Sequence, residues 1–314
     1  MRMSKYQKSL LIVDGSNLAH RSYQKFLNLK SGGIPTGLIY GFMRLLQGYI
    51  LRFRPTYVII TFDTRKSKDS NFRLKLLGDY KIHREDEKHK LRIDYEDFNS
   101  QLRVVKRLLK YLNIPVVWDK KGLGHESDDY IAYFANKHPG KVVIISSDKD
   151  FCQLITSQVK VFNPFKEVIL RTDNCKDVMG YSPEECIDYL CLVGDKSDDI
   201  PGYQGMGPVK TRKFLDEWGS IQNFLDKKGE FRGIDYEGLQ AVYKRNVELI
   251  SLEYAIKHQP FEKIPLVYNQ KDRINEKKVR ETFLEYSFHS FLTKDFMKAF
   301  RKLQVWREED YASN

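Results

Sequence analysis

The chain has 314 residues, and 41% of them are hydrophobic. This length and composition exclude a peptide, a disordered tail and a collagen-like fibre, and they suggest one large domain or two smaller ones. The 53 Lys and Arg residues exceed the 42 Asp and Glu residues, so the formal net charge is +11. Such an excess favours a polyanionic partner such as nucleic acid, although a surface that only maintains solubility can also be basic.

Three further features concern location and redox state. No stretch reaches the roughly 18 to 20 apolar residues of a membrane span, and no secretory signal stands at the N-terminus. We therefore expect no membrane association and a cytoplasmic monomer, or one in the host cytoplasm if a phage encodes it. The four cysteines have neither CxxC spacing nor a histidine at zinc-finger distance, so we expect them to be reduced and buried.

The first half of the chain alternates predicted strands and helices. Apolar runs and helical periodicity predict strands at 10–13, 57–62, 114–118 and 142–146, and helices at 37–54, 98–112 and 127–137. Continuous apolar runs are typical of strands that are buried on both faces. Repeated strand–helix–strand units predict an α/β domain over 1–182, with a mostly parallel, Rossmann-like sheet flanked by helices.

A polar segment at about 65–97 interrupts this alternation. Residues 65–92 contain ten Lys or Arg and five Asp or Glu residues, and apolar residues become rare after Leu77. We expect this insertion to pack poorly by itself.

The second half is predicted to be a helical domain over 183–314. Ser182 and Pro183 resemble a helix start, and the glycine-rich segment 202–208 predicts a tight hairpin before a basic helix. Further helices are predicted at 221–227, 236–257 and 276–303.

Acidic residues follow the predicted strands and open the predicted helix at 127. Because ligands bind beyond the carboxyl ends of parallel strands, we expect these acids to meet at one rim. Each alone fits a helix cap or a turn, but together they would repel one another unless cations bound there. Oxygen ligands favour Mg²⁺ or Mn²⁺ over zinc, and two such ions about 3.5–4 Å apart would promote phosphodiester hydrolysis. The predicted metal ligands are Asp14, Asp63, Glu126, Asp128, Asp129, Asp148, Asp150, Asp195 and Asp198.

An ordered series of motifs over 10–218 resembles the structure-specific 5′-nuclease family. The series comprises Val-Asp-Gly-Ser-Asn at 13–17, Phe-Asp at 62–63, Phe-Arg at 72–73, Tyr-Lys-Ile-His-Arg at 80–84, Gly-His-Glu-Ser-Asp-Asp at 124–129, Ile-Ser-Ser-Asp-Lys-Asp at 145–150 and Val-Gly-Asp-Lys-Ser-Asp at 193–198. A helix–hairpin–helix motif at about 190–218 follows. This family includes flap endonucleases, 5′→3′ exonucleases, the 5′-nuclease domain of bacterial DNA polymerase I and stand-alone phage enzymes of the RNase H type.

The resemblance implies two Mg²⁺ ions, with Mn²⁺ as a substitute. Asp14, Asp63, Glu126, Asp128 and Asp148 would hold one ion, and Asp129, Asp150, Asp195 and Asp198 would serve the other. The polar insertion would form a helical arch for a single-stranded 5′ end.

The resemblance also implies contacts to DNA. Lys81 and Arg84 would contact the scissile phosphate, Arg21 would help from the other side, and Tyr80 would stack on an unpaired base. The remaining predicted DNA-binding residues are Arg73, Gly202, Gly205, Gly207, Lys210, Arg212 and Lys213. The hairpin would also hold K⁺. His125, Ser127 and Asp199 depart from the family pattern, which more often has an aromatic residue, Ala and Asn there.

The implied function is a free-standing, Mg²⁺-dependent 5′-nuclease of the two-metal type that acts on branched, nicked or RNA-primed DNA during replication. A single-stranded-DNA-binding protein or a sliding clamp would be its protein partner. A non-catalytic DNA-junction-binding protein and a PIN-like ribonuclease are alternatives, and a phosphatase with an Asp-x-Asp motif is a weaker one. Cleavage of a flap duplex distinguishes these functions.

Overall fold

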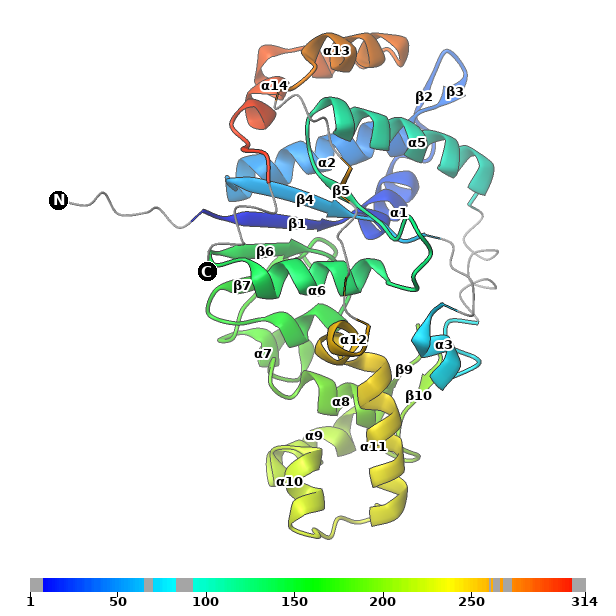
Figure 1. The fold of residues 1–314 in the computed structure, drawn as a ribbon, viewed down its shortest axis with the longest axis vertical. Helices are drawn as coiled ribbons and strands as arrows, with labels where there is room; N and C mark the ends of the chain where they lie inside the picture. Colours follow the sequence, from blue (N-terminus) through cyan, green and yellow to red (C-terminus); the bar gives the residue numbers. More distant parts are fainter. Residues whose placement is uncertain are drawn as a thin grey trace, which may run out of the picture.

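The protein is described from a computed structural model that covers residues 8–64, 70–82, 93–259, 261, 266–267 and 273–306 (Figure 1). Within these residues, seven strands form one sheet in the order β11-β5-β4-β1-β6-β7-β8. Their bounds are β1 Leu10–Asp14, β4 Tyr57–Thr61, β5 Val116–Val117, β6 Val142–Ile145, β7 Val159–Asn163, β8 Val168–Leu170 and β11 Leu266–Val267. The five central strands are parallel, and β8 and β11 are antiparallel edges. The predicted mostly parallel α/β fold is confirmed.

Alternate residues of β1 pack into two different cores. Leu11 and Val13 join the core beneath α2 (Gly37–Phe53) and α5 (Tyr95–Tyr111), and Leu10 and Ile12 join the core beneath α6 (Ser127–Lys137). Figure 1 shows these helices on opposite faces of the sheet. This two-sided burial explains why the strand is an unbroken apolar run.

Helix α1 (Gly15–Lys25) begins directly after β1 and was not predicted from the sequence. Asp14 caps it by accepting a hydrogen bond from the Asn17 N–H at 2.9 Å. A Cβ atom at Gly15 would lie 2.6 Å from the Thr61 carbonyl oxygen, so only glycine lets α1 start this close to β4. Because α1 starts directly after β1, Asp14 at the end of the strand lies at the rim with the other acids.

The described part of the polar insertion has a few side chains that pack on distant helices, and its other residues are exposed or half-buried. Helix α3 (Phe72–Leu76) buries Phe72 and Arg73, and the Phe72 ring lies 5.1 Å from the His258 ring, centroid to centroid. The insertion also ends earlier than predicted, because α5 begins at Tyr95. The rest of the predicted arch, at 65–69 and 83–92, lies outside the described residues, and Arg84 is part of it.

The helical half differs from the prediction at its boundaries. The described helices of this half are α8 Cys186–Val193, α9 Pro208–Trp218, α10 Ile221–Asp226, α11 Tyr236–Ile250, α12 Leu252–His258, α13 Glu276–Glu285 and α14 Lys294–Arg301, with a short 3₁₀ turn at His289–Phe291. A 3₁₀ turn at Asp150–Leu154 and α7 Cys175–Met179 precede them. The first helix starts at Cys186 rather than at Pro183 because residues 183–185 form a turn. The predicted helix 236–257 breaks at Ser251, whose extended backbone (ψ 115°) ends α11 and whose Oγ caps α12. The predicted helix 276–303 is split by the turn at His289–Phe291.

Three elements within the predicted helical domain over 183–314 pack on the α/β layer. Strand β11 pairs with β5, α13 packs on α5, and α14 packs on α2. Phe283 and Phe296 are buried in the same core as Leu11, so packing rather than helix content assigns these helices to the sheet. All four cysteines are free and buried, as predicted. None of the helices in the described ranges is long and apolar enough to cross a membrane.

Candidate metal centre

The carboxyl ends of β1, β4 and β6 bring three predicted ligands to one rim. Asp14 ends β1, Asp63 lies two residues beyond β4, and Asp148 lies three residues beyond β6. Ser146 connects two of them, because its Oγ donates to Asp14 Oδ2 at 2.8 Å and accepts from the Asp148 N–H at 3.1 Å. Parallel neighbouring strands therefore produce the predicted convergence.

The protonation of these acids reflects burial and mutual repulsion. Burial raises the pKa of Asp14 to about 7, and the nearby charges of Asp63 and Asp148 add to the rise. Burial also raises the pKa values of Asp128, Asp148 and Asp150, and neighbouring carboxylates again contribute. Buried like charges favour the neutral acid unless a cation compensates them. A cation bound at this rim would therefore offset the repulsion among these acids.

The N-terminus of α6 contributes Glu126, which is the N-cap of the helix and is only 8% exposed. Its Oε2 accepts a hydrogen bond from Lys81 Nζ at 2.8 Å, and Lys81 Nζ also lies 3.3 Å from Asp198 Oδ2. The Lys81 N–H donates to the Asp198 carbonyl oxygen at 3.1 Å, which fixes the position of the lysine. Lys81 therefore reaches these acids from the base of the insertion.

Tyr80 and Arg73 do not have the DNA-binding positions predicted for them. Tyr80 is 5% exposed, and its hydroxyl lies 3.1 Å from Glu126 Oε2 and 3.2 Å from Asp198 Oδ2. Arg73 is 2% exposed and cannot reach a bound duplex. Both side chains face the interior because they satisfy buried carboxylates there.

Asp129 is used as a structural partner of Arg73. Arg73 binds it with both terminal nitrogens, at 2.7 and 3.3 Å, and donates from Nε to the Leu249 carbonyl oxygen at 3.1 Å. The second Asp129 oxygen also accepts from the Glu126 N–H at 2.8 Å. Each Asp129 oxygen therefore accepts a hydrogen bond within the protein, and Arg73 links this residue of α6 to α3 and α11.

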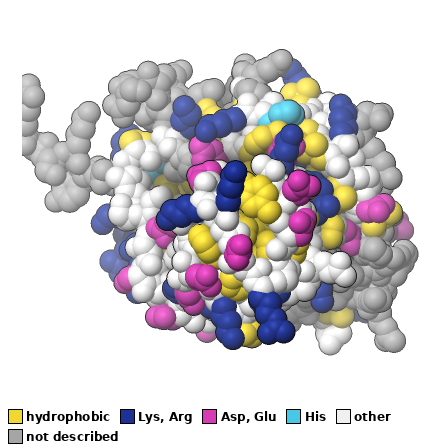
Figure 2. Space-filling model, turned by 90° about the horizontal axis from the view of Figure 1, so that it is seen from below, with side chains coloured by type: hydrophobic (Ala, Val, Ile, Leu, Met, Phe, Trp, Pro, Cys, Tyr) yellow, Lys and Arg dark blue, Asp and Glu magenta, His cyan; other side chains and the backbone are white. Residues whose placement is uncertain are grey.

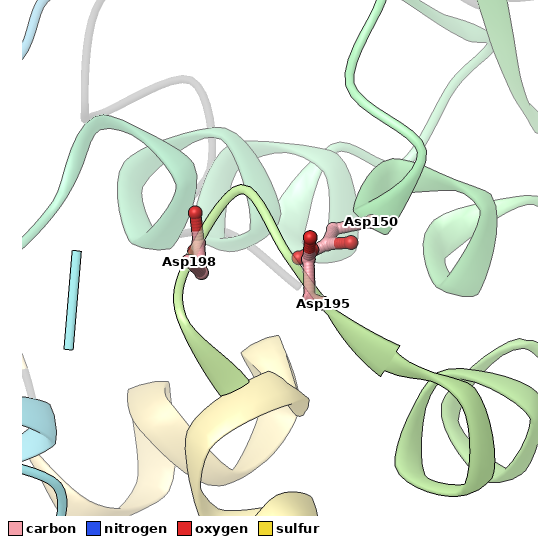
Figure 3. Close-up of side chains that lie close together, drawn as sticks. All are labelled: Asp150, Asp195 and Asp198. Carbon is pink, nitrogen blue, oxygen red and sulfur yellow. The ribbon is translucent and has the colours of Figure 1, made fainter. Parts of the chain in front are cut away.

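Asp150, Asp195 and Asp198 form the tightest acid cluster of the described chain. Their carboxylate oxygens lie within 4.8 Å of one another. Figure 3 shows Asp195 and Asp198 on the two limbs of the turn between β9 (Gly194–Asp195) and β10 (Ile200–Pro201), with Asp150 close to Asp195. Burial alone would raise the pKa of Asp195, but hydrogen bonds from Lys149 and Ser197 lower it.

This donor set suits a hard divalent cation. It offers carboxylate oxygens without Cys or His, which is the ligand chemistry of Mg²⁺ and Mn²⁺. Asp150 Oδ1 is buried and accepts no hydrogen bond from any residue that the structure describes. A buried carboxylate oxygen without a donor is costly, and a bound cation would satisfy it.

The predicted hairpin joins α8 to α9, and its glycines have two different roles. A Cβ atom at Gly202 would lie 2.4 Å from the Leu192 carbonyl oxygen, so the close packing of this segment requires glycine there. Gly205 has a left-handed backbone (φ 79°), and Gly205 and Gly207 are both exposed with open space around their Cα atoms. Their positions fit the predicted contact with a phosphate backbone.

The three predicted cations of α9 are not equivalent. Lys213 is exposed and Lys210 is half-buried. Arg212 binds both oxygens of Glu185, at 2.6 and 2.8 Å, and Asp216 at 3.0 Å, so its charge is already used within the protein. Figure 2 views the molecule from the helical end and shows acidic side chains interspersed with the basic ones.

Several supporting residues were not predicted. Lys149 Nζ lies 2.8 Å from Asp195 Oδ1, and Asn71 Nδ2 donates to Glu126 Oε1 at 3.2 Å. Lys149 stands between Asp148 and Asp150 in the sequence, and this position could have indicated its pairing with an acid. Nothing near Asn71 in the sequence indicates its contact with Glu126. Asp199 has a left-handed backbone (φ 58°), which Asn and Asp tolerate, so this departure from the family pattern preserves the turn.

Comparisons with known proteins agree with this geometry. The family model described as "5'-3' exonuclease, N-terminal resolvase-like domain" matches residues 9–185, and the one described as "5'-3' exonuclease, C-terminal SAM fold" matches 181–256. A 5'-3' exonuclease of Aquifex aeolicus is 37% identical over 246 residues, which cover 76% of this chain and 80% of that protein.

Two solved structures from bacteriophage T5 have the same fold. The T5 5'-exonuclease with bound zinc ions has a TM-score of 0.67 at 23% identity, covering 89% of this chain and 100% of that one. A complex of the T5 flap endonuclease with DNA and metal ions has a TM-score of 0.66 at 23% identity, covering 90% of this chain and 100% of that one.

Proposed function

This chain belongs to the 5′-3′ exonuclease family and is a metal-dependent hydrolase of DNA, and from this premise we propose that it cuts branched substrates with two Mg²⁺ ions. The substrates are 5′ flaps, nicked duplexes and RNA-primed DNA. Its products are short oligonucleotides released from the 5′ end.

The observation that carries this proposal is the convergence of the acids at one rim of a basic protein. The cluster of Asp150, Asp195 and Asp198 lies next to Asp148, whose charge contributes to the raised pKa of Asp150. A protein that only binds DNA gains nothing from carboxylates that repel phosphate. A nuclease needs them, because two bound divalent ions would activate a water and stabilise both reacting oxygens of the phosphodiester.

The ligand sets proposed for the ions start from those that the family resemblance implies. Asp14, Asp63, Asp128 and Asp148 serve one ion together with Glu126, and Asp150, Asp195 and Asp198 serve the other. Mg²⁺ is the proposed resident ion, and Mn²⁺, which has similar ligand chemistry, replaces it. The T5 relative was solved with zinc, but the absence of Cys and His from this ligand set favours Mg²⁺.

Lys81 is the residue of this chain proposed to act on the scissile phosphate. Its ammonium lies between Glu126 and Asp198, so it contacts a proposed ligand of each ion. In that position it stabilises negative charge that develops on the phosphate. Arg84 keeps the same proposed role but lies outside the described residues.

Duplex DNA is proposed to bind at the hairpin before α9. The exposed backbone at Gly205 and Gly207 and the N-terminus of α9 offer N–H groups to phosphate, and Lys210 and Lys213 add charge. Contacts of this kind hold a duplex without reading its sequence. Cleavage is therefore expected to follow the structure of the substrate, and K⁺ at the hairpin is expected to strengthen duplex binding.

The test is cleavage of a 5′-labelled flap duplex by the purified protein, with Mg²⁺ and with a chelator, beside Asp148→Asn. The proposal expects Mg²⁺-dependent cutting near the branch that the variant loses. Asp173→Asn is the matched control, because this exposed aspartate pairs with Arg171 away from the rim. Tight binding without cutting in Mg²⁺ or Mn²⁺ would instead identify a junction-binding protein.

A further inference from the structure

A groove beside the metal centre has no role in the proposed chemistry. It has a volume of about 600 Å³, and it lies between the outer face of α1 and the turn that joins β7 to β8. Its lining includes Asn17, His20, Arg21, Gln24, Lys25 and Phe165. Among the described residues, no acidic side chain lines it, in contrast to the rim next to it.

The floor of the groove is continuous with the acid cluster. Asn17 Nδ2 donates to Ser147 Oγ at 2.7 Å, and Ser147 precedes Asp148 in the chain. The Asn17 N–H donates to Asp14 Oδ1. The groove therefore begins directly beside Asp14 and Asp148.

The cations of the groove suit phosphate. Arg21 and Lys25 are one helical turn apart on α1, so they lie on the same face of the helix. Arg21 Nε is buried, and no residue of the described chain accepts a hydrogen bond from it. Within the part of the chain that the structure describes, this guanidinium forms no ion pair, and it lines the groove, where charge-assisted hydrogen bonds to phosphate are strong.

The wall opposite α1 presents an aromatic ring. Phe165 is 81% exposed although it is a large apolar side chain. Its turn is fixed, because Asn163 Oδ1 accepts hydrogen bonds from the N–H groups of Phe165 and Lys166, both at 2.9 Å. The other ring of the groove, His20, is already stacked on Phe98 with 4.7 Å between centroids. Phe165 is therefore the ring that is open to a ligand.

We propose that this groove binds one unpaired nucleotide of the cleaved strand next to the scissile phosphate, with Phe165 stacked on its base. Arg21 and Lys25 hold the adjoining phosphates. The base is unpaired because paired bases inside a duplex already stack on both faces, whereas a single exposed ring needs a free face. This inference rests on the proposed nuclease function and adds a determinant of substrate choice to it.

The test compares wild type with Phe165→Ala in single-turnover cleavage of flap substrates. One substrate carries normal nucleotides, and two others carry an abasic residue on either side of the scissile phosphate. On the normal substrate the variant should lose roughly 5- to 100-fold in kcat/KM, the range measured for base stacking. On the substrate that is abasic at the stacked position, wild type and variant should cleave equally. Phe165→Trp should restore the activity.

Two further variants make the test specific. Leu284→Ala removes another exposed apolar side chain, on α13, and should have no effect. Lys25→Gln should weaken binding of every flap sequence and reduce the salt dependence of binding by about one phosphate contact.

The outcomes separate the inference from the proposed function. If wild type does not cleave, the nuclease proposal fails. If wild type cleaves and Phe165→Ala matches it on the normal substrate, the groove inference fails and the nuclease proposal stands. If Phe165→Ala is equally impaired on all three substrates, Phe165 stabilises the turn rather than a base, and the inference is overturned as well.

Discussion

Replacing Asp14 by Asn should stabilise the metal-free protein, even though Asp14 caps α1. Its carboxyl group is 6% exposed, and its pKa rises from an ordinary value of 3.8 to about 7 in the folded protein. The folded state therefore binds a proton more tightly than the unfolded state. Because ionisation favours unfolding, this group lowers stability progressively as the pH rises from 3.8 to about 7.

The size of the effect follows from the two pKa values. At 1.36 kcal/mol for each pH unit, wild type should lose about 2 kcal/mol of unfolding free energy between pH 5 and pH 7 through this group, and close to 3 kcal/mol by pH 8. Asp14→Asn should not show this loss, because its amide cannot ionise and can still accept the hydrogen bond from the Asn17 N–H.

The assay is urea unfolding at pH 5 and pH 8 in the presence of a chelator. Asp235→Asn is the matched control, because Asp235 also caps a helix by accepting a backbone N–H bond, from Gly238, but is exposed and outside the cluster. The stability difference between Asp14→Asn and wild type should grow by about 3 kcal/mol from pH 5 to pH 8, while the control difference changes little. If the stability difference between Asp14→Asn and wild type did not depend on pH, the claim that burial and neighbouring carboxylates raise the pKa of Asp14 would be refuted. Mg²⁺ at pH 8 should then stabilise wild type much more than the variant.

Three other predictions concern the same region. Arg73→Met should lower the free energy of unfolding in urea by about 3–5 kcal/mol, because it leaves Asp129 buried without its partner. The control Arg171→Met, at an exposed ion pair, should lower it by less than about 1 kcal/mol. Equal losses would contradict the structural role of Arg73. Lys81→Met should slow single-turnover cleavage by about 100-fold without changing duplex affinity, and a loss of affinity alone would contradict its proposed position at the phosphate. The Mg²⁺ concentration for half-maximal cleavage should be higher at pH 6 than at pH 8, since protons compete for Asp14 below about pH 7; the opposite trend would show that the acid is ionised throughout.

The sequence predicted the central sheet and the acidic rim well, because both depend on local patterns. Apolar runs identify β1 and β4, and an acid directly after a buried strand must lie at its carboxyl end. The motif series also predicted the family to which the chain belongs. Helix α1 was missed although Leu18, Ala19 and Tyr23 have helical spacing, because few of its residues are apolar. Its cap Asp14 and Gly15 indicated where it begins.

The errors arose where long-range contacts decide what a residue does. Arg73 and Tyr80 are a cation and an aromatic residue in a basic segment, which is typical of a DNA-binding surface. Their burial depends on α11 and on the β9–β10 turn, more than 100 residues later in the chain. In the same way, β11, α13 and α14 are assigned to the sheet by packing partners that no local pattern identifies.

The central claim is that these carboxylates bind two divalent ions. Anomalous diffraction from crystals grown with Mn²⁺ tests it most directly. The account predicts two peaks per chain about 3.5–4 Å apart. One should lie against Asp14 and Asp148 and the other against Asp150, Asp195 and Asp198, and Asp195→Asn combined with Asp198→Asn should remove only the second. A single peak away from both sets, or no peak in crystals of a protein that cleaves DNA in Mn²⁺, would contradict the account.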